Sequence, residues 1–177
     1  MGQRPLGGAT LTSMGNLRAA GVGAATGWWL WSGTEYVMHR WGMHGPWRRQ
    51  PMAAEHLRHH GEPLATDPVL RALSYLPVAL GGVGLGAAAS RLAGTTFGRA
   101  AGLAFVAGYT AYEQLHWRAH HRHPANPPER WLWRRHMAHH ARARLNYGVT
   151  TAFWDRLAGT AAPEAPVRRA RAGHAVA

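Results

Sequence analysis

Uncharged apolar stretches alternate along this chain with stretches rich in Arg and His. The stretch 72–89 has roughly 18 residues without a charge, the lower length limit for a helix that crosses hydrocarbon. Residues 19–34 are also uncharged and apolar character continues to Met38, so we expect a first membrane helix with interfacial tryptophans near its end. A shorter run, 100–112, can cross when it is extended to Leu115. The pattern predicts an all-α integral membrane protein with a small transmembrane helical bundle.

Two polar segments, 40–71 and 116–144, flank the second and third apolar runs. If the chain crosses outward at 72–89 and returns at 100–115, both polar segments lie on the same side of the membrane. Most Arg residues lie in these segments, with few in the turn between the runs. Because Arg-rich loops stay in the cytoplasm, we expect a cytosolic, histidine-rich helical cap. The expected location is the plasma membrane of a bacterium.

The composition limits both the size class and the chemistry. A chain of 177 residues makes one domain, and it contains no cysteine. Disulfides, thiolate zinc sites and cysteine nucleophiles are therefore excluded, and a metal must bind through nitrogen or oxygen. The formal net charge of +12 comes from Arg alone, which suits a nucleic-acid binder or a membrane protein with a basic cytoplasmic face. The uncharged run 72–89 argues against a nucleic-acid partner.

The chain divides into three expected parts. Residues 1–16, rich in Gly, Thr and Ser, are expected to form a flexible lead. Residues 17–160 form the membrane domain. Residues 161–177 are basic and rich in Ala and Pro, so we expect a disordered tail.

Histidine is the residue type that points to chemistry, with 13 copies that fall mainly in four clusters. The clusters read HRWGMH, HLRHH, HWRAHH and HMAHH. The ten candidate metal ligands are His39, His44, His56, His59, His60, His116, His120, His136, His139 and His140. Residues three and four apart share a helix face, so most of these rings can point to one side of their helix. The topology above allows all ten to converge.

The first cluster needs a local irregularity, because His39 and His44 are five residues apart and diverge on a straight helix. Gly42 and the Gly45-Pro46 pair allow the backbone to unwind after Met43, which would return His44 to the site. Ten imidazoles exceed what one ion can bind, so two metal ions are implied. Neutral imidazole suits zinc, copper, iron and nickel.

Carboxylates lie next to these clusters. Glu35, Glu55 and Glu113 each lie within four residues of a candidate ligand. We expect them to accept the second ring N–H of a ligand and so to fix its tautomer. On a helix His121 points about 140° away from His116, which makes it a candidate for supporting contacts and not for the metal.

In these clusters and in two further segments, the chain resembles the fatty acid hydroxylase and sterol desaturase superfamily of membrane oxygenases. The segments are 112–121 (YEQLHWRAHH) and 146–160 (NYGVTTAFWDRLAGT), and the resemblance covers about 35–160. The second string follows the last histidine cluster in the family with nearly this wording. Asn146, which opens it, is a further candidate for supporting contacts.

The resemblance implies a cytosolic dimetal cap that uses two iron ions and O2 to insert oxygen into an unactivated C–H bond. It also implies that the ten histidines above are the ligands. The third cluster and the closing run are similar to the acyl-chain 2-hydroxylase branch, so the expected substrate is a membrane lipid acyl chain. Zinc accepts imidazole as well as iron does, so purified protein can carry either.

Electrons are expected to come from a separate electron-transfer protein, because some relatives carry a fused haem domain for which this chain has no room. Relatives commonly have four membrane helices, whereas one candidate precedes His39 here. Two alternatives stay open. The stretch 39–46 is similar to carotenoid hydroxylases, so a carotenoid or sterol hydroxylase or desaturase is one, and a non-catalytic metal-binding membrane protein is the other.

Overall fold

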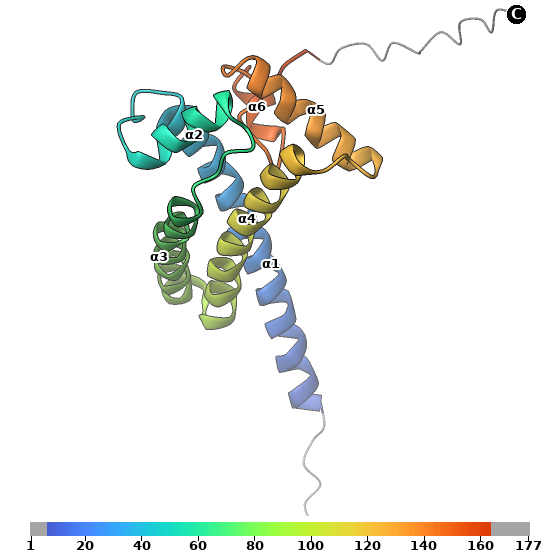
Figure 1. Ribbon diagram of the computed structural model, residues 1–177. Coiled ribbons are helices and arrows are strands. Elements are labelled where there is room, and N and C mark those ends of the chain that lie inside the picture. Colours follow the sequence, from blue (N-terminus) through green and yellow to red (C-terminus); the bar gives the residue numbers. More distant parts are fainter. Residues whose placement is uncertain (1–6, 164–177) are drawn as a thin grey trace, which may run out of the picture.

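The computed structural model describes residues 7–163, and within that range it contains helices and loops but no strand. The helices are α1 (Gly7–Val37), the π-helix η1 (Met38–Met43), α2 (Pro51–Gly61), α3 (Pro68–Ala93), α4 (Thr95–His121), α5 (Pro127–Ala141) and α6 (Phe153–Leu157). Three long helices, α1, α3 and α4, extend from a cluster formed by α2, α5 and α6 (Figure 1). The expected all-α class is confirmed for the described residues.

Three helices begin with the same local signal, a capping side chain followed by proline. Gln50, Asp67 and Asn126 cap α2, α3 and α5, and each accepts a hydrogen bond from a backbone N–H two or three residues later. The proline that follows has a fixed φ and no N–H, which suits the first helical position. These caps fix where α2 and α5 start, and therefore which way their histidines face.

Helices α3 and α4 form the hairpin that the two apolar runs predict. Gly94 makes the turn at φ 90°, a conformation that glycine adopts without strain. Along the contact Gly82 and Gly86 lie against Gly98 and Gly102, and a Cβ on either α4 glycine would overlap atoms of α3. Small residues of this kind let helix backbones approach closely.

Helix α4 also packs along α1, so it lies between two long helices. Gly23 and Gly27 of α1 lie against the α4 backbone, and Gly108 of α4 lies against the Trp31 ring. The buried core cluster consists of Trp31, Tyr109, Tyr112 and Val149. Contacts on both sides therefore fix the direction in which α4 presents its two candidate ligands.

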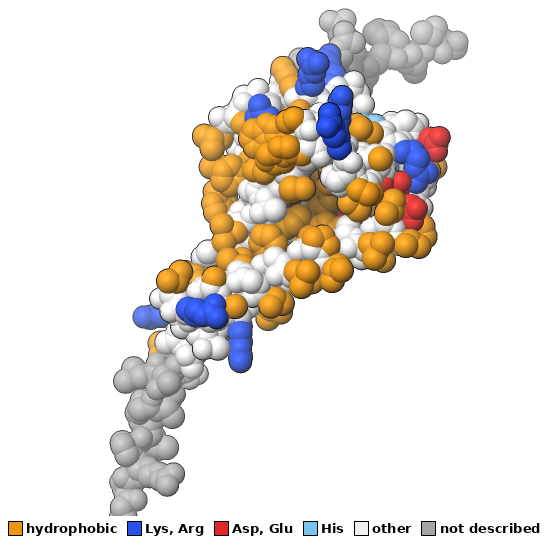
Figure 2. Space-filling view, turned by 90° about the vertical axis from the view of Figure 1, so that its left-hand side faces the viewer, with side chains coloured by type: hydrophobic (Ala, Val, Ile, Leu, Met, Phe, Trp, Pro, Cys, Tyr) orange, Lys and Arg blue, Asp and Glu red, His pale blue; other side chains and the backbone are white. Residues whose placement is uncertain are grey.

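By length and composition, α3 is the one helix in the described part of the chain that could cross a membrane. Its apolar side chains face outward, and Leu80 and Val83 are 64% and 71% exposed. Hydrophobic side chains cover much of the face in Figure 2. Helices α1 and α4 occupy the other two expected spans but do not pass the same test, because glycine, hydroxyl and aromatic side chains dilute their apolar content. Those two spans stay predictions.

Helix α1 begins at Gly7, inside the stretch 1–16 that was expected to form a flexible lead. No proline interrupts the chain between Pro5 and Pro46, so one helix can continue through the Gly- and Thr-rich stretch. The division of the chain near residue 16 stays a prediction. Residues 164–177, most of the expected tail, lie outside the described residues.

Candidate metal centre

All ten candidate histidines meet where η1, α2, α4 and α5 come together, and they form two groups of five. The first group is His39, His44, His56, His60 and His139, and the second is His59, His116, His120, His136 and His140. Within each group, one ring nitrogen per residue lies within 4.8 Å of those of all the others. The groups adjoin, because the His60 and His140 rings stack with centroids 4.3 Å apart.

The π-helix η1 brings His39 and His44 into one group although they are five residues apart. The His44 N–H donates to the His39 carbonyl at 3.2 Å, the i to i+5 bond of a π-turn. This wider turn places the two rings on one side, with centroids 5.2 Å apart. The expected unwinding after Met43 is therefore replaced by a π-turn that ends at Met43.

The two His-x2-His-His clusters each contribute to both groups. In α2, His56 and His60 are four residues apart and enter the first group, whereas His59 enters the second. In α5 the arrangement is reversed, since His136 and His140 enter the second group and His139 the first. Adjacent residues on a helix point about 100° apart, so one helix can reach two neighbouring sites.

The ring nitrogens are too crowded to satisfy one another by hydrogen bonds. His56 Nε2 lies 3.1 Å from His39 Nε2, 2.8 Å from His44 Nε2 and 3.2 Å from His60 Nε2. A neutral imidazole nitrogen has either one N–H or one lone pair, so it cannot make three such bonds. In the second group the buried Nε2 atoms of His116 and His140 have no hydrogen-bond partner in the described part. Converging lone pairs of this kind fit metal ions.

Burial lowers the pKa of all ten histidines, and the charges of neighbouring histidines lower it further in nine of them. The pKa falls to about 4 for His44, His59 and His120 and to about 3 for His139 and His140. It falls well below the ordinary value for His39, His56, His116 and His136. The rings are therefore neutral at pH 7, the form that binds a metal.

Backbone carbonyls orient two rings of the first group. Nδ1 of His39 donates to the Tyr147 carbonyl at 2.5 Å, and Nδ1 of His139 donates to the Leu145 carbonyl at 2.7 Å. Each bond leaves Nε2 as the lone-pair atom that faces the group. Both carbonyls belong to the loop between α5 and α6, so the position of this loop determines the direction of the rings.

Asp155 of α6 holds that loop in place. The sequence analysis included Asp155 only as part of the run 146–160 and did not identify it as a candidate site residue. Its side chain is fully buried, and it accepts from the backbone N–H groups of Tyr147 at 2.8 Å and Gly148 at 2.9 Å. It also accepts from the Thr160 hydroxyl and from Arg135, each at 2.8 Å. The available signal was that Asp155 is the one carboxylate in the closing run 146–160.

Glu35 supports the same loop, and among the described residues its hydrogen bonds go to this loop and not to a histidine ring. Its carboxylate accepts from the backbone N–H groups of Val149 at 2.5 Å and Thr150 at 3.0 Å, and from the Thr150 hydroxyl. Two buried carboxylates from α1 and α6 therefore fix residues 147–150. The effect of Glu35 on His39 passes through the loop.

Among the described residues, the hydrogen bonds of Glu55, Glu113 and His121 do not go to a candidate ligand ring. Glu55 pairs with Arg58 at 2.7 Å, and Glu113 pairs with Arg71 at 2.7 Å. His121 lies outside both groups, with its ring stacked on Trp117.

Asn146 has a structural role in the α5–α6 loop. It adopts a φ of 54°, a left-handed conformation that Asn tolerates better than most residues. Its side chain donates to the Arg135 carbonyl at 3.2 Å and accepts from the Ala162 N–H at 2.8 Å. It therefore supports the loop from which the two orienting carbonyls come.

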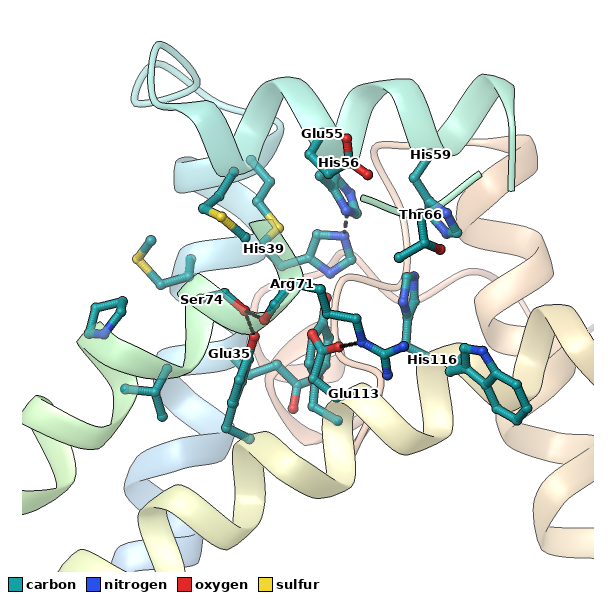
Figure 3. Close-up of a pocket in the computed structure, with 18 of the residues that line it drawn as sticks. Glu35, His39, Glu55, His56, His59, Thr66, Arg71, Ser74, Glu113 and His116 are labelled. Atoms are coloured by element: carbon teal, nitrogen blue, oxygen red, sulfur yellow. Dashed lines mark hydrogen bonds and ion pairs between the residues drawn. The ribbon is translucent and has the colours of Figure 1, made fainter. Parts of the chain in front are cut away.

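A cavity of about 630 Å³ leads from the apolar helices to the histidines. Val78, Gly81 and Phe105 line its apolar end. Figure 3 shows His39, His56 and His59 on one side of the cavity and Arg71, Ser74 and Glu113 on the other, with His116 next to Arg71. The cavity volume lies within the range of small-molecule binding sites, and its lining suits a ligand with an apolar chain and a polar end.

The fold and the site define an all-helical protein with two adjoining histidine groups that could each hold a metal ion, next to an apolar cavity. The family model for fatty acid hydroxylase matches residues 24–160. The chain therefore belongs to the fatty acid hydroxylase family, and the predicted resemblance is confirmed.

Two curated relatives come from Arabidopsis thaliana. The chain is 28% identical to dihydroceramide fatty acyl 2-hydroxylase FAH1 over 76% of its own length and 58% of the relative's. It is 29% identical to dihydroceramide fatty acyl 2-hydroxylase FAH2 over 79% of its own length and 60% of the relative's. The chain thus spans about 60% of the length of these relatives.

A solved structure described as full-length Scs7p, with only the hydroxylase domain visible, has a similar fold. The TM-score is 0.63 at 26% sequence identity, and the match covers 85% of this chain and 59% of that chain.

Proposed function

We propose that this chain is a membrane-bound hydroxylase of lipid acyl chains, and that its ten clustered histidines hold two metal ions, iron in the working enzyme. The observation that carries the proposal is the cavity that joins an apolar space between α3 and α4 to crowded, neutral histidine nitrogens. Membership of the fatty acid hydroxylase family and the printed names of the relatives as fatty acyl 2-hydroxylases support it.

Each histidine group would hold one ion. Side chains cannot attack an alkyl C–H bond, so bound ions would supply the oxygen chemistry. Overall, one atom of O2 would enter the C–H bond, and the other would leave as water after the addition of two electrons and two protons. A separate electron-transfer protein would deliver the electrons. Nitrogen ligands without cysteine suit iron, and zinc competes for the same donors.

The residues of this chain would bind the acyl chain, orient the ligand rings and keep water away from the substrate. The apolar end of the cavity, with Val78 and Phe105, would hold the acyl chain away from water. The carbonyls of Leu145 and Tyr147 would keep two ligand rings in the tautomer that offers Nε2. We place α1, α3 and α4 in a bacterial plasma membrane, with the histidine cap on the Arg-rich cytoplasmic side.

The experiment combines metal analysis of the detergent-purified protein with lipid mass spectrometry of cells that do or do not express it. We expect two iron ions per chain and an acyl species that has gained one oxygen atom. A double variant, His56→Ala with His116→Ala, removes one proposed ligand from each group and should abolish the product. Stoichiometric zinc and unchanged lipids, with a working reductase present, would instead favour a non-catalytic metal-binding protein.

A further inference from the structure

The wall of the cavity contains an ion pair that the metal centre does not use. Arg71 of α3 donates through Nε to Glu113 of α4 at 2.7 Å, and their side chains are 31% and 13% exposed. Arg71 is the single arginine among the described residues that line the cavity. Figure 3 shows the pair directed into the space beside His116.

The pair offers hydrogen-bond donors without a net charge. Arginine has five N–H bonds in a fixed planar arrangement, and the bond to Glu113 uses the one on Nε. Within the described part of the chain, no acceptor contacts the two terminal amino groups of Arg71. Because Glu113 balances the charge of the guanidinium, these groups suit a carbonyl oxygen of an uncharged acyl group better than a free carboxylate.

The pair lies between the apolar end of the cavity and the histidines. Along α4, Glu113 precedes His116 by three residues, which corresponds to about 4.5 Å along a helix axis. Along α3, Arg71 is followed on the cavity side by Ser74, Val78 and Gly81, where the lining becomes apolar. A carbonyl bound at Arg71 would therefore place its nearest methylene beside the histidines and leave the rest of the chain in the apolar end.

We propose that Arg71, held in place by Glu113, binds the carbonyl oxygen of an amide- or ester-linked acyl chain and thereby selects the methylene next to that carbonyl. This inference rests on the proposed function, because it names the residue that positions the substrate of that site. Glu113 acts through Arg71: it fixes the guanidinium and removes its net charge.

Binding without turnover tests the contact. The full chain in detergent, with no electron donor, is titrated with radiolabelled hexadecanoyl amide and, separately, with hexadecanoic acid. We expect Arg71→Gln to weaken binding of the amide roughly tenfold or more, the effect of a charged hydrogen bond. Arg118→Gln is the matched control, because Arg118 also pairs with a glutamate, Glu129, but lies outside this cavity. Its affinity for the amide should equal that of wild type.

Two further variants separate a binding role from a folding role. Arg71→Lys keeps a positive charge near Glu113 for the α3–α4 contact but loses the planar pair of terminal amino groups, so it should fold and still bind the amide more weakly. Glu113→Gln leaves the charge of Arg71 unbalanced, so the preference should move from the amide toward the free acid. A merely structural pair would not produce that reversal.

The position of hydroxylation supplies the last readout. Wild type should give one product with oxygen on the carbon next to the carbonyl, and Arg71→Lys should give a spread over several carbons. Equal amide affinity in wild type, Arg71→Gln and Arg71→Lys would overturn the inference. If wild type makes no hydroxylated lipid but its amide binding depends on Arg71, the proposed function fails and the binding site stands.

Discussion

His56 illustrates why a single side chain in this protein is suited to bind a metal ion. It is 6% exposed, and its Nε2 faces three other histidine nitrogens that it cannot satisfy together. Burial also lowers its pKa well below the ordinary value, so the ring keeps its lone pair at neutral pH.

We expect His56→Ala to weaken metal binding in the first group at least roughly tenfold, since even supporting contacts of metal ligands commonly have effects of that size. Metal content per chain, measured after dialysis against a weak chelator, should fall toward one ion. His121→Ala is the control. His121 lies at the end of α4 next to His120, but it is outside both histidine groups. Full metal content in His56→Ala would show that this ring is not a ligand.

Asp155 gives the second prediction at this scale, because it connects the loop to the rest of the cap. Asp155→Asn exchanges a buried carboxylate that accepts four hydrogen bonds for an amide with only one acceptor oxygen. Disrupting a buried pair costs roughly 3 kcal/mol, so the free energy of unfolding should fall by about that amount.

Thermal unfolding in detergent measures this change. The matched control is Glu129→Gln, which disrupts the more exposed pair with Arg118 and should cost less than about 1 kcal/mol. An equal loss in both variants would mean that Asp155 has no special role in the cap.

The roles of individual residues in the site differ in how well the sequence predicts them. Helical spacing in the histidine clusters predicted ten residues that the structure brings together. The same reasoning failed for Glu35, because a spacing of four residues from His39 allows a contact but does not show that backbone N–H groups over 110 positions away compete for the carboxylate. Asp155 was missed because helical spacing does not reveal its partners, which include two loop N–H groups.

Among the elements, the α3–α4 hairpin depends on close helix packing. A Cβ on Gly102 would overlap the Gly82 carbonyl, whereas a Cβ on Gly84 meets nothing within 4 Å. Gly102→Ala should therefore lower stability by about 1–3 kcal/mol, the usual cost of overpacking. Gly84→Ala should be neutral or should stabilise by up to about 1 kcal/mol, because alanine favours helix.

The two glycine variants are compared by thermal unfolding, together with their metal content. Because α4 carries His116 and His120, displacement of the hairpin by Gly102→Ala should also reduce metal in the second group. If both variants unfold at the wild-type temperature, the helices are not packed as closely as the structure shows.

The regular helices and the π-turn differ in how well the sequence predicts them. The apolar runs of α3 and α4 are continuous patterns, and they predicted this hairpin. The starts of α2, α3 and α5 were not predicted, although a capping residue followed by proline at Gln50, Asp67 and Asn126 is a local signal for them. The π-turn of η1 is different, because glycines near His44 permitted unwinding and a wide turn alike. Packing of α2 and of the 145–149 loop against the rings selects the π-turn, and such contacts are invisible in the sequence.

At the scale of the whole molecule, ten buried or half-buried histidines are held together by η1, α2, α4 and α5 and by the loop between α5 and α6. Each of the ten clustered histidines has a lowered pKa in the folded protein, with burial as the main cause. In the unfolded chain they return to an ordinary pKa of about 6.5. The unfolded chain therefore binds more protons than the folded metal-free protein whenever the pH lies between the two values.

This difference fixes the sign of the pH dependence. Stability increases with pH wherever the unfolded state binds more protons, so the metal-free protein should be most stable above about pH 6.5 and should lose stability steadily as the pH falls toward 4. The window from pH 6.5 to 5 is informative, because ordinary Asp and Glu side chains titrate below it. Thermal unfolding of chelator-treated protein should show a falling midpoint across this window, and saturating metal should raise the midpoint most at neutral pH, since protons and metal compete for the same nitrogens. A midpoint that is constant from pH 7 to 5 would mean that the folded protein binds the same number of protons as the unfolded chain. The histidines would then have an ordinary pKa in the folded protein, and the cluster would be a poor metal site.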